Sequence, residues 1–578
     1  MAWKAFLVAL HPVLFFSIQL DCGIPVMSLC AVFRHSLFMR DQFGNTHRIL
    51  MSPCSRFRTY AQCIPIALLI LLLVATGCTN VPPLSSTPSR FEEKVSAITS
   101  APQYAHTSWG IIVVDPSSGI PLYERNADEL FLPGSTAKLF SSAAILEALG
   151  PDHRFVTPVY AVGDLGSSGE LDGILVLVAR GDLTMGGRTL PDDTIEFTNI
   201  DHGDANALEG AILTATYPCA GLDALASQVK GSGIRKVSDV VIDDRLFETA
   251  NQWDPVLSPI VINDNLLDII ITPGVPGTPP TLAMRPETSA YLLDNRVTTG
   301  PAGSPLSIAI TEGPGHTIVV SGIVAADAGQ VNQTYSVRDP AVYARTLFIE
   351  ALERQGIDVT AQATGDNPGE KLPVMNGYAG SQKVAELISP PLIEDVKLTL
   401  KVSQNMHANS YIMLLATASN GTGFYDGMKE EGRILSSLGL DTTAVSLGDG
   451  AGGVSEDRIS PRAAAHLLTI IHTRPYAEKF VRAQPILGVD GSLAMSCKAD
   501  NPACGKVYAK TGTSINYDSM NDRAILLAKS LAGYLDAKSG KRLVFAVYAN
   551  NVPISSLDDM MAVGEDIGSI AGFIYEYY

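Results

Sequence analysis

The chain has 578 residues and a formal net charge of −18 at pH 7, with 46% hydrophobic and 17% charged residues. This composition is typical of a globular protein of about three domains and excludes a disordered chain. The acidic balance argues against a nucleic-acid partner, because nucleic-acid binding requires a basic surface.

The first 77 residues differ in charge from the rest, since they hold six basic and two acidic residues. Residues 66–75 are an unbroken apolar run, and Arg56 and Arg58 precede it. Ten residues are too few to span a bilayer, which needs about 20. A basic segment followed by a short apolar run is typical of an export signal.

The sequence Ala75-Thr76-Gly77-Cys78 follows this run and resembles a bacterial lipobox, with Ala75 where Leu is usual. We therefore expect lipid attachment at Cys78 and a periplasmic protein anchored to the (outer) membrane. An ordinary cleaved signal peptide is the alternative. We also expect translation to start at Met51, which would leave residues 1–50 without a role. Residues 78–92 are rich in Pro and Ser and are expected to form a tether.

Four of the eight cysteines precede Cys78. In an oxidising compartment Cys497 and Cys504 are close enough in sequence to form a disulfide, which would leave Cys219 alone. The sequence has no Cys-x-x-Cys or His-Glu-x-x-His pattern, so we expect neither a metal nor another cofactor.

The predicted elements change character along the chain. A β-hairpin (109–115 and 120–124) and a helix (135–149) come first, and residues 155–385 are mostly short strands with one clear helix (340–355). The last part is predicted as helices followed by strands and a final helix: 394–403, 407–418, 425–438, 461–472, 507–510, 531–536, 543–550 and 558–577. Predicted strands lie near the start and near the end of residues 93–578, with helices between them. This arrangement predicts one α+β domain (93–155 and 386–578) interrupted by a β-rich insertion (156–385).

Three short motifs occur in order along the chain: Ser135-Thr136-Ala137-Lys138, Ser403-Gln404-Asn405 and Lys510-Thr511-Gly512-Thr513. A lone Ser-x-x-Lys is weak evidence, since Ser227 and Lys230 form another one. The ordered trio, however, is the signature of penicillin-binding proteins and class A β-lactamases.

Each residue type suits acyl transfer. Ser135 and Lys138 share one helix face, and a serine hydroxyl needs such a base to become a nucleophile. Burial and a second cation, for which Lys510 is the candidate, lower the pKa of a lysine enough for it to act as that base. Ser403 is placed to relay a proton, and Asn405 to bond both a lysine and a substrate amide.

With these motifs the chain resembles the D-alanyl-D-alanine carboxypeptidase/endopeptidase family, the class C low-molecular-mass penicillin-binding proteins. Ser135 and Ser403 are 268 positions apart, a gap that fits this family's large insertion and exceeds that of β-lactamases. Residues 449–452 and 488–493 resemble two further family segments, although Ala451 stands where Ser is usual. The resemblance implies a transpeptidase-like fold: an antiparallel sheet flanked by helices, an all-helical subdomain and a large, mostly β insertion.

The resemblance also implies roles for individual residues. The backbone N–H groups of Ser135 and Thr513 would form the oxyanion hole, and Thr511 and Thr513, on either side of Gly512, would bind the terminal carboxylate of the substrate. An acid of the insertion would contact the amino group of the stem peptide's diamino acid, and Asp243 is our match, with a turn aspartate as the alternative. His407 is expected to be a packed helix residue. The segment after Thr513 is longer than expected and could cover the site.

The sequence thus predicts a serine DD-peptidase that acts on peptidoglycan stem peptides and cross-links through an acyl-serine intermediate. β-Lactam antibiotics are expected as covalent inhibitors. Carboxypeptidase and endopeptidase action use the same chemistry and stay open. Two alternatives are a β-lactamase or esterase on the same fold and a non-catalytic lipoprotein that binds peptidoglycan.

Overall fold

The computed structural model describes residues 38–40, 46–48 and 89–578. The chain divides into two compact units, Met1–Thr87 and Pro88–Tyr578. In the first unit, strand β1 (Phe38–Arg40) pairs with β2 (Thr46–Arg48). The predicted export signal and Cys78 lie outside the described residues. Everything below concerns the second unit.

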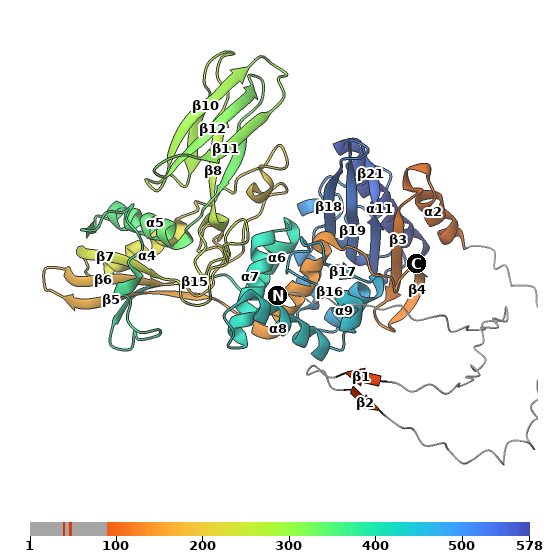
Figure 1. Cartoon of the computed structure of the whole chain (residues 1–578), viewed down its shortest axis with the longest axis horizontal. Helices are drawn as coiled ribbons and strands as arrows, with labels where there is room; N and C mark the ends of the chain where they lie inside the picture. The colour runs from red at the N-terminus through yellow and green to blue at the C-terminus, as the bar shows by residue number, and fades with distance from the viewer. Residues whose placement is uncertain (1–37, 41–45, 49–88) are drawn as a thin grey trace, which may run out of the picture. The chain divides into compact units, whose positions relative to one another are not determined.

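The second unit contains an antiparallel sheet with the strand order β18-β19-β20-β3-β4, and β21 pairs with β19 at one end (Figure 1). Two strands come from the start of this unit and four from its end, so distant parts of the chain share one sheet. The strands are β3 (Ser108–Asp115), β4 (Ile120–Arg125), β18 (Val507–Asp518), β19 (Arg523–Asp536), β20 (Arg542–Asn550) and β21 (Val552–Ile554).

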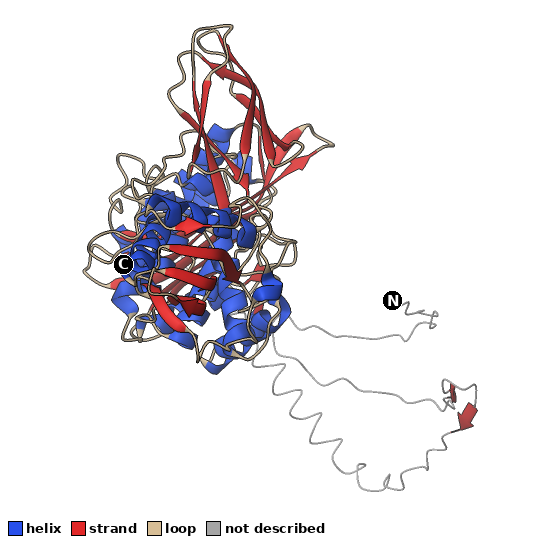
Figure 2. Ribbon diagram, turned by 90° about the vertical axis from the view of Figure 1, so that its left-hand side faces the viewer, coloured by secondary structure: helices blue, strands red, loops and turns tan. Residues whose placement is uncertain are grey.

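Both faces of this sheet are covered by helices (Figure 2). Strand β3 shows why, because successive side chains of a strand point to opposite faces. Ile111 and Val113 pack with α2 (Arg90–Thr99) and α11 (Leu557–Tyr577), whereas Ile112 and Val114 belong to the core on the other face. The sheet is therefore the middle layer of three.

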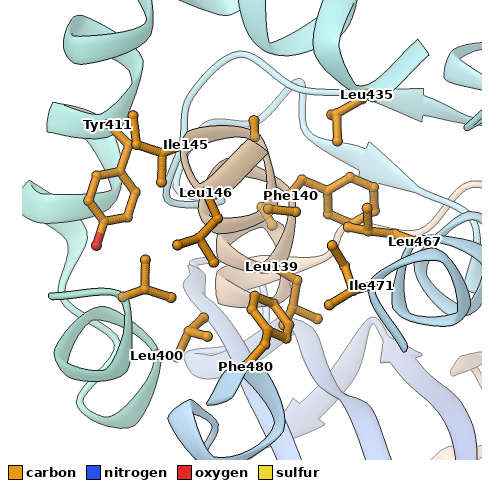
Figure 3. Packing of buried hydrophobic residues seen from close by; sticks show 14 of the residues in the cluster. Leu139, Phe140, Ile145, Leu146, Leu400, Tyr411, Leu435, Leu467, Ile471 and Phe480 are labelled. Atoms are coloured by element: carbon orange, nitrogen blue, oxygen red, sulfur yellow. The ribbon is translucent and has the colours of Figure 1, made fainter. Parts of the chain in front are cut away.

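The second core surrounds α3 (Lys138–Leu149), which is buried on nearly every side (Figure 3). Such a helix carries apolar side chains all round instead of one apolar stripe. The helices around it come from the later part of the chain: α6 (Leu392–Lys401), α7 (Asn405–Ala418), α8 (Phe424–Ser437), α9 (Pro461–His472) and α10 (Ala477–Ala483). A short pair, β16 (Val445–Ser446) and β17 (Arg458–Ile459), lies between α8 and α9 in sequence.

Between α3 and α6 the chain forms a separate β-rich region with its own core. A five-stranded sheet packs with α4 (Ala220–Gly231) and α5 (Pro340–Arg354), and two three-stranded sheets follow. The five strands are β5 (Val156–Leu165), β6 (Glu170–Val178), β7 (Lys236–Asp243), β14 (Asp358–Val359) and β15 (Gln382–Ile388). The other six are β8 (Leu266–Thr272), β9 (Thr281–Arg285), β10 (Leu292–Gly300), β11 (Ser307–Glu312), β12 (Thr317–Ala325) and β13 (Val331–Ser336). The predicted fold class, including the mostly β insertion, is confirmed.

Two local expectations change. The segment after Thr513 is not a loop, because β18 continues to Asp518 and β19 begins at Arg523, with a bulge between Ser514 and Ile515. Its exposed, polar residues hide the strand pattern. The helix predicted from residue 135 begins instead as a 3-10 turn, Gly134–Ala137, before α3.

The predicted disulfide between Cys497 and Cys504 is formed, and Cys219 is a buried free cysteine. Within the described part of the chain, every helix is too short or too polar to cross a lipid bilayer.

Candidate active site

The structure brings the three sequence motifs together where the 3-10 turn before α3 meets the start of α7 and strand β18. Ser135 lies on the turn and Lys138 is the first residue of α3. The Nζ atom of Lys138 lies 2.8 Å from Ser135 Oγ and 2.6 Å from Asn405 Oδ1. The Nζ atom of Lys510 lies 3.0 Å from Ser403 Oγ. The five predicted residues thus form a group of three around Lys138 and a pair, Lys510 and Ser403.

Lys138 is fully buried, and its third partner is the backbone oxygen of Ala451 at 2.9 Å. Burial lowers the pKa of Lys138 to about 7, although Asp449 and Asp204 oppose this effect. A neutral amine has two N–H groups and one lone pair. The oxygens of Asn405 and Ala451 only accept hydrogen bonds, so they take both N–H groups. The lone pair is then left to face the Ser135 hydroxyl.

Lys510 is also fully buried, and burial together with the charge of Lys138 holds its pKa well below the usual value. Its Nζ atom donates to the backbone oxygen of Thr511 at 2.8 Å as well as to Ser403. Ser403 has a φ of 64°, a left-handed conformation that costs a non-glycine residue free energy. The fold holds this residue between α6 and α7 so that its hydroxyl meets Lys510.

Two glycines allow the serine turn to approach strand β18 closely. A Cβ at Gly134 would lie 2.8 Å from Thr513 N, and a Cβ at Gly512 would lie 3.1 Å from Ser135 N and 2.2 Å from Pro133 O. The backbone nitrogens of Ser135 and Thr513 therefore flank the same small space. Paired N–H groups of this kind can stabilise a developing oxyanion. Thr511 is oriented from the other side by the Ser492 hydroxyl, 2.8 Å from its Oγ1.

The glycine loop of residues 449–452 provides a hydrogen-bond acceptor for Lys138. Asp449 Oδ1 accepts hydrogen bonds from the N–H groups of Ala451, Gly452 and Gly453. This turn directs the Ala451 carbonyl at Lys138. The contact is made by the backbone, so Ala in place of the family's Ser leaves it intact.

Asp243 is not among the hydrogen-bond or charge partners of Lys138 and Lys510. It ends strand β7, and its carboxylate accepts hydrogen bonds from Arg245 and from Tyr378. Burial opposes its ionisation, but these hydrogen bonds outweigh burial and hold the pKa of Asp243 below its usual value. Its carboxylate is thus already paired inside the β-rich region, and its predicted role in substrate binding stays a prediction.

A second acid of the insertion, which the sequence analysis did not name, is Asp204. Its charge acts on both Lys138 and Lys510. It is half-buried, and burial and Asp201 raise its pKa although the two lysines lower it. The segment around Asp204 has no recognisable pattern, so only the tertiary structure could find it.

His407, expected to be a packed residue, is fully buried on α7 and belongs to a charged network. Its ring nitrogens lie 3.2 Å from Asp264 and 3.0 Å from Asp395. Asp264 also accepts a hydrogen bond from Gln404, the central residue of the second motif. His407 therefore contacts the second motif indirectly, through the Asp264 carboxylate that Gln404 also binds.

Most of the chain is similar to known proteins. The D-alanyl-D-alanine carboxypeptidase of Actinomadura sp. strain R39 is 28% identical over 520 residues, which cover 85% of this chain and 87% of that protein. The penicillin-sensitive carboxypeptidase A of Dictyostelium discoideum is 24% identical over 81% of this chain and 88% of its own length. The crystal structure of penicillin binding protein 4 from Haemophilus influenzae shares the fold, with a TM-score of 0.62 at 20% identity over 84% of this chain and 99% of that one.

The profile of one family spans both the sheet and the insertion, since it matches residues 91–567. It includes all three motifs and every element that positions them. This chain therefore belongs to the D-Ala-D-Ala carboxypeptidase 3 (S13) family.

Proposed function

We propose that this protein is a serine DD-peptidase that hydrolyses D-Ala-D-Ala ends or cross-links of peptidoglycan stem peptides through an acyl-serine. The single observation that carries the proposal is the placement of Ser135 Oγ 2.8 Å from a buried lysine whose other two partners are acceptors. Family membership supports the same reaction.

In this mechanism neutral Lys138 takes the proton of the Ser135 hydroxyl as the Oγ atom attacks the carbonyl carbon. The negative charge on the former carbonyl oxygen is stabilised by the N–H groups of Ser135 and Thr513. The C–N bond then breaks, and the leaving amine receives a proton from the Lys138 ammonium or through Ser403, which Lys510 contacts. Water then attacks the carbonyl carbon of the acyl-serine, and its proton passes to the same base. The bond between this carbon and Ser135 Oγ breaks, and Oγ takes the proton back from Lys138.

The insertion would contribute an acid that recognises the amino group of the stem peptide. Asp204 is our preferred candidate for this role, because its charge acts on the two lysines, whereas Asp243 is paired with Arg245. We expect Asp204→Asn to raise KM for peptides with a free side-chain amine and to leave N-acetylated peptides unchanged.

The test of the reaction is covalent labelling of the purified protein with a fluorescent penicillin. We expect one stable label, lost in Ser135→Ala and retained in Ser227→Ala, which removes the serine of the second Ser-x-x-Lys sequence. Label that survives Ser135→Ala would reject the mechanism. Rapid hydrolysis of a chromogenic cephalosporin would indicate a β-lactamase instead. Analysis of digested muropeptides would separate carboxypeptidase from endopeptidase action.

We further propose lipid anchoring at Cys78, which the lipobox-like sequence supports. Cells fed radiolabelled palmitate should yield labelled protein in the membrane fraction. Cys78→Ser should abolish the label, whereas Cys63→Ser should not. Label that persists in Cys78→Ser, or an unlabelled wild-type protein, would favour an ordinary cleaved signal peptide.

A further inference from the structure

A third lysine lies at the edge of the site. Lys529 is on strand β19 directly opposite Thr513 of β18, and its Nζ atom lies 3.0 Å from Thr513 Oγ1. Paired residues of an antiparallel sheet have their side chains on the same face. Helix α11 leaves room for the side chain, since a Cβ at Gly564 would lie 3.4 Å from Lys529 Cε.

Lys529 forms no ion pair with any carboxylate among the residues that the structure describes. It is half-buried, and burial lowers its pKa to about 8, so it is still mostly protonated at pH 7. A cation that is partly withdrawn from water without an anion is energetically unfavourable. An anion beside Thr513 would relieve this cost.

Lys510 is less suited to hold that anion. Its Nζ atom is directed at Ser403 and at the backbone of Thr511, and its side chain is completely buried. The positive charge of Lys529 itself contributes to the lowered pKa of Lys510. Of the lysines near the serine, Lys529 is therefore the one with a partly exposed and unpaired ammonium.

The substrate supplies an anion at this position, if the proposed function holds. The scissile carbonyl must lie against Ser135 Oγ, and the carboxylate of the final residue follows roughly 4 Å further along, the spacing of successive residues. Thr513 adjoins Ser135 across Gly134, where a Cβ would lie 2.8 Å from Thr513 N. We propose that Lys529, together with the Thr513 hydroxyl, binds the carboxylate next to the scissile bond and makes the enzyme selective for substrates that carry it.

The experiment measures whether the contribution of Lys529 to activity requires a free carboxylate on the substrate. Wild type and Lys529→Gln are compared on a peptide ending in D-Ala-D-Ala and on the same peptide with a C-terminal amide. Acylation by benzylpenicillin and by its methyl ester gives a second pair that does not require turnover. Lys529→Arg tests rescue by a conserved charge, and Lys541→Gln, an exposed lysine in the connection between β19 and β20, is the matched control.

We expect Lys529→Gln to lower kcat/KM at least tenfold for the free carboxylates, mainly through KM, and less than twofold for the amide and the ester. Lys529→Arg should retain most of the wild-type preference. Equal losses on both members of a pair, or no loss on either, would overturn the proposal. Failure of benzylpenicillin to acylate wild-type Ser135 would instead reject the proposed function, so the two failures are distinguishable.

Discussion

Lys138 is held by neutral partners only, because the oxygens that accept its hydrogen bonds belong to Asn405 and to the backbone of Ala451. A carboxylate in direct contact would favour the ammonium and remove the base. The acids Asp449, Asp204 and Asp457 act from further away and limit how far burial lowers the pKa. This balance leaves the lysine with a pKa of about 7, which suits a base at neutral pH.

The pH dependence of acylation follows from this value. The neutral form of Lys138 is the reactive one, so the rate of penicillin acylation should rise with pH and reach half its plateau near pH 7. At pH 6 the rate should be about one tenth of the plateau. Stopped-flow measurement of Ser135 acylation between pH 5 and 9 checks this profile. Asp204→Asn removes a charge that raises the pKa of Lys138, so its midpoint should move to lower pH. Asp164→Asn, at an exposed position, should not move it.

Gly512 sets how closely strand β18 approaches the nucleophile. In Gly512→Ala the new Cβ would lie 2.2 Å from both Pro133 O and Ser530 Oγ, so the serine turn must move away. We expect acylation to fall about 100-fold, the usual effect of a displaced oxyanion donor. Acylation kinetics and circular dichroism check this together. Gly540→Ala, where a Cβ meets open space but φ is positive, controls for loss of a glycine in the turn between β19 and β20. Wild-type kinetics in Gly512→Ala would contradict the prediction.

At the scale of elements, α3 positions the catalytic pair because its neighbours surround it. Leu139, Phe140, Ile145 and Leu146 are 0–1% exposed and contact helices from the later part of the chain. The core on this helix thus fixes the serine turn relative to the Asn405 end of α7. Packing of this kind resists displacement, since protein interiors have little free volume.

Removing part of this core should cost stability. Leu146→Ala lies two turns beyond Lys138 and is expected to lower the free energy of unfolding by about 2–5 kcal/mol, as buried leucines do. Urea denaturation followed by fluorescence measures this change. Leu130→Ala, at a side chain that is 49% exposed, should change stability by less than about 1 kcal/mol. Equal effects of the two variants would show that α3 is not packed as described.

At the scale of the whole second unit, a buried ionic network joins the β-rich region to α7. Four potential cations face four carboxylates within it: Arg188, His202, Arg285 and His407 with Asp201, Asp264, Asp268 and Asp395. Asp264 is its centre, since it contacts the insertion's own arginine and histidine as well as Gln404 and His407. His202, a member of this network, lies two residues from Asp204 in the sequence. The insertion therefore helps to position two sides of the site.

Asp201, His202 and Asp264 have a spacing that could suit a metal ion, but Arg188 already donates to both carboxylates. The positive guanidinium supplies the charge that a cation would bring. The sequence expectation of no metal thus stays a prediction, with this arginine in its support.

The network makes stability depend on pH. Burial alone would lower the pKa of His202 and His407, but the neighbouring carboxylates raise both to about 10. Their contribution is complete below about pH 6.5, where the unfolded chain is also protonated, and is lost as pH rises toward 10. The free energy of unfolding in urea should therefore fall between pH 6.5 and 10.

A histidine variant tests whether the network causes this decline of the free energy of unfolding with pH. Buried Glu431, whose pKa burial raises to about 8, favours low pH in the same way. His407→Gln should flatten the decline, whereas His316→Gln, in a loop between two strands of the β-rich region, should retain it. A wild-type decline that His407→Gln leaves unchanged would place the effect elsewhere, with Glu431→Gln as the next variant to measure.

Much of the fold follows from local pattern. Pro461 at the start and the apolar spacing after it predict α9 with its observed bounds, and the hairpin of β3 and β4 is predicted by two apolar runs around a turn. The polar ends of β18 and β19 were missed, since pairing with each other stabilises them more than any apolar alternation does. The division into domains stays a prediction.

The sequence by itself determined the chemistry of this protein, because Ser135 and Lys138 are neighbours on one turn and the other two motifs are recognisable as short strings. Only the tertiary structure decided which distant groups face them. The charge of Asp204 acts on Lys138, the Ala451 carbonyl accepts a hydrogen bond from that lysine, and strand pairing places Lys529 opposite Thr513. The physical reason is that electrostatic and hydrogen-bond partners depend on distance in space, which is set by the packing of elements hundreds of residues apart.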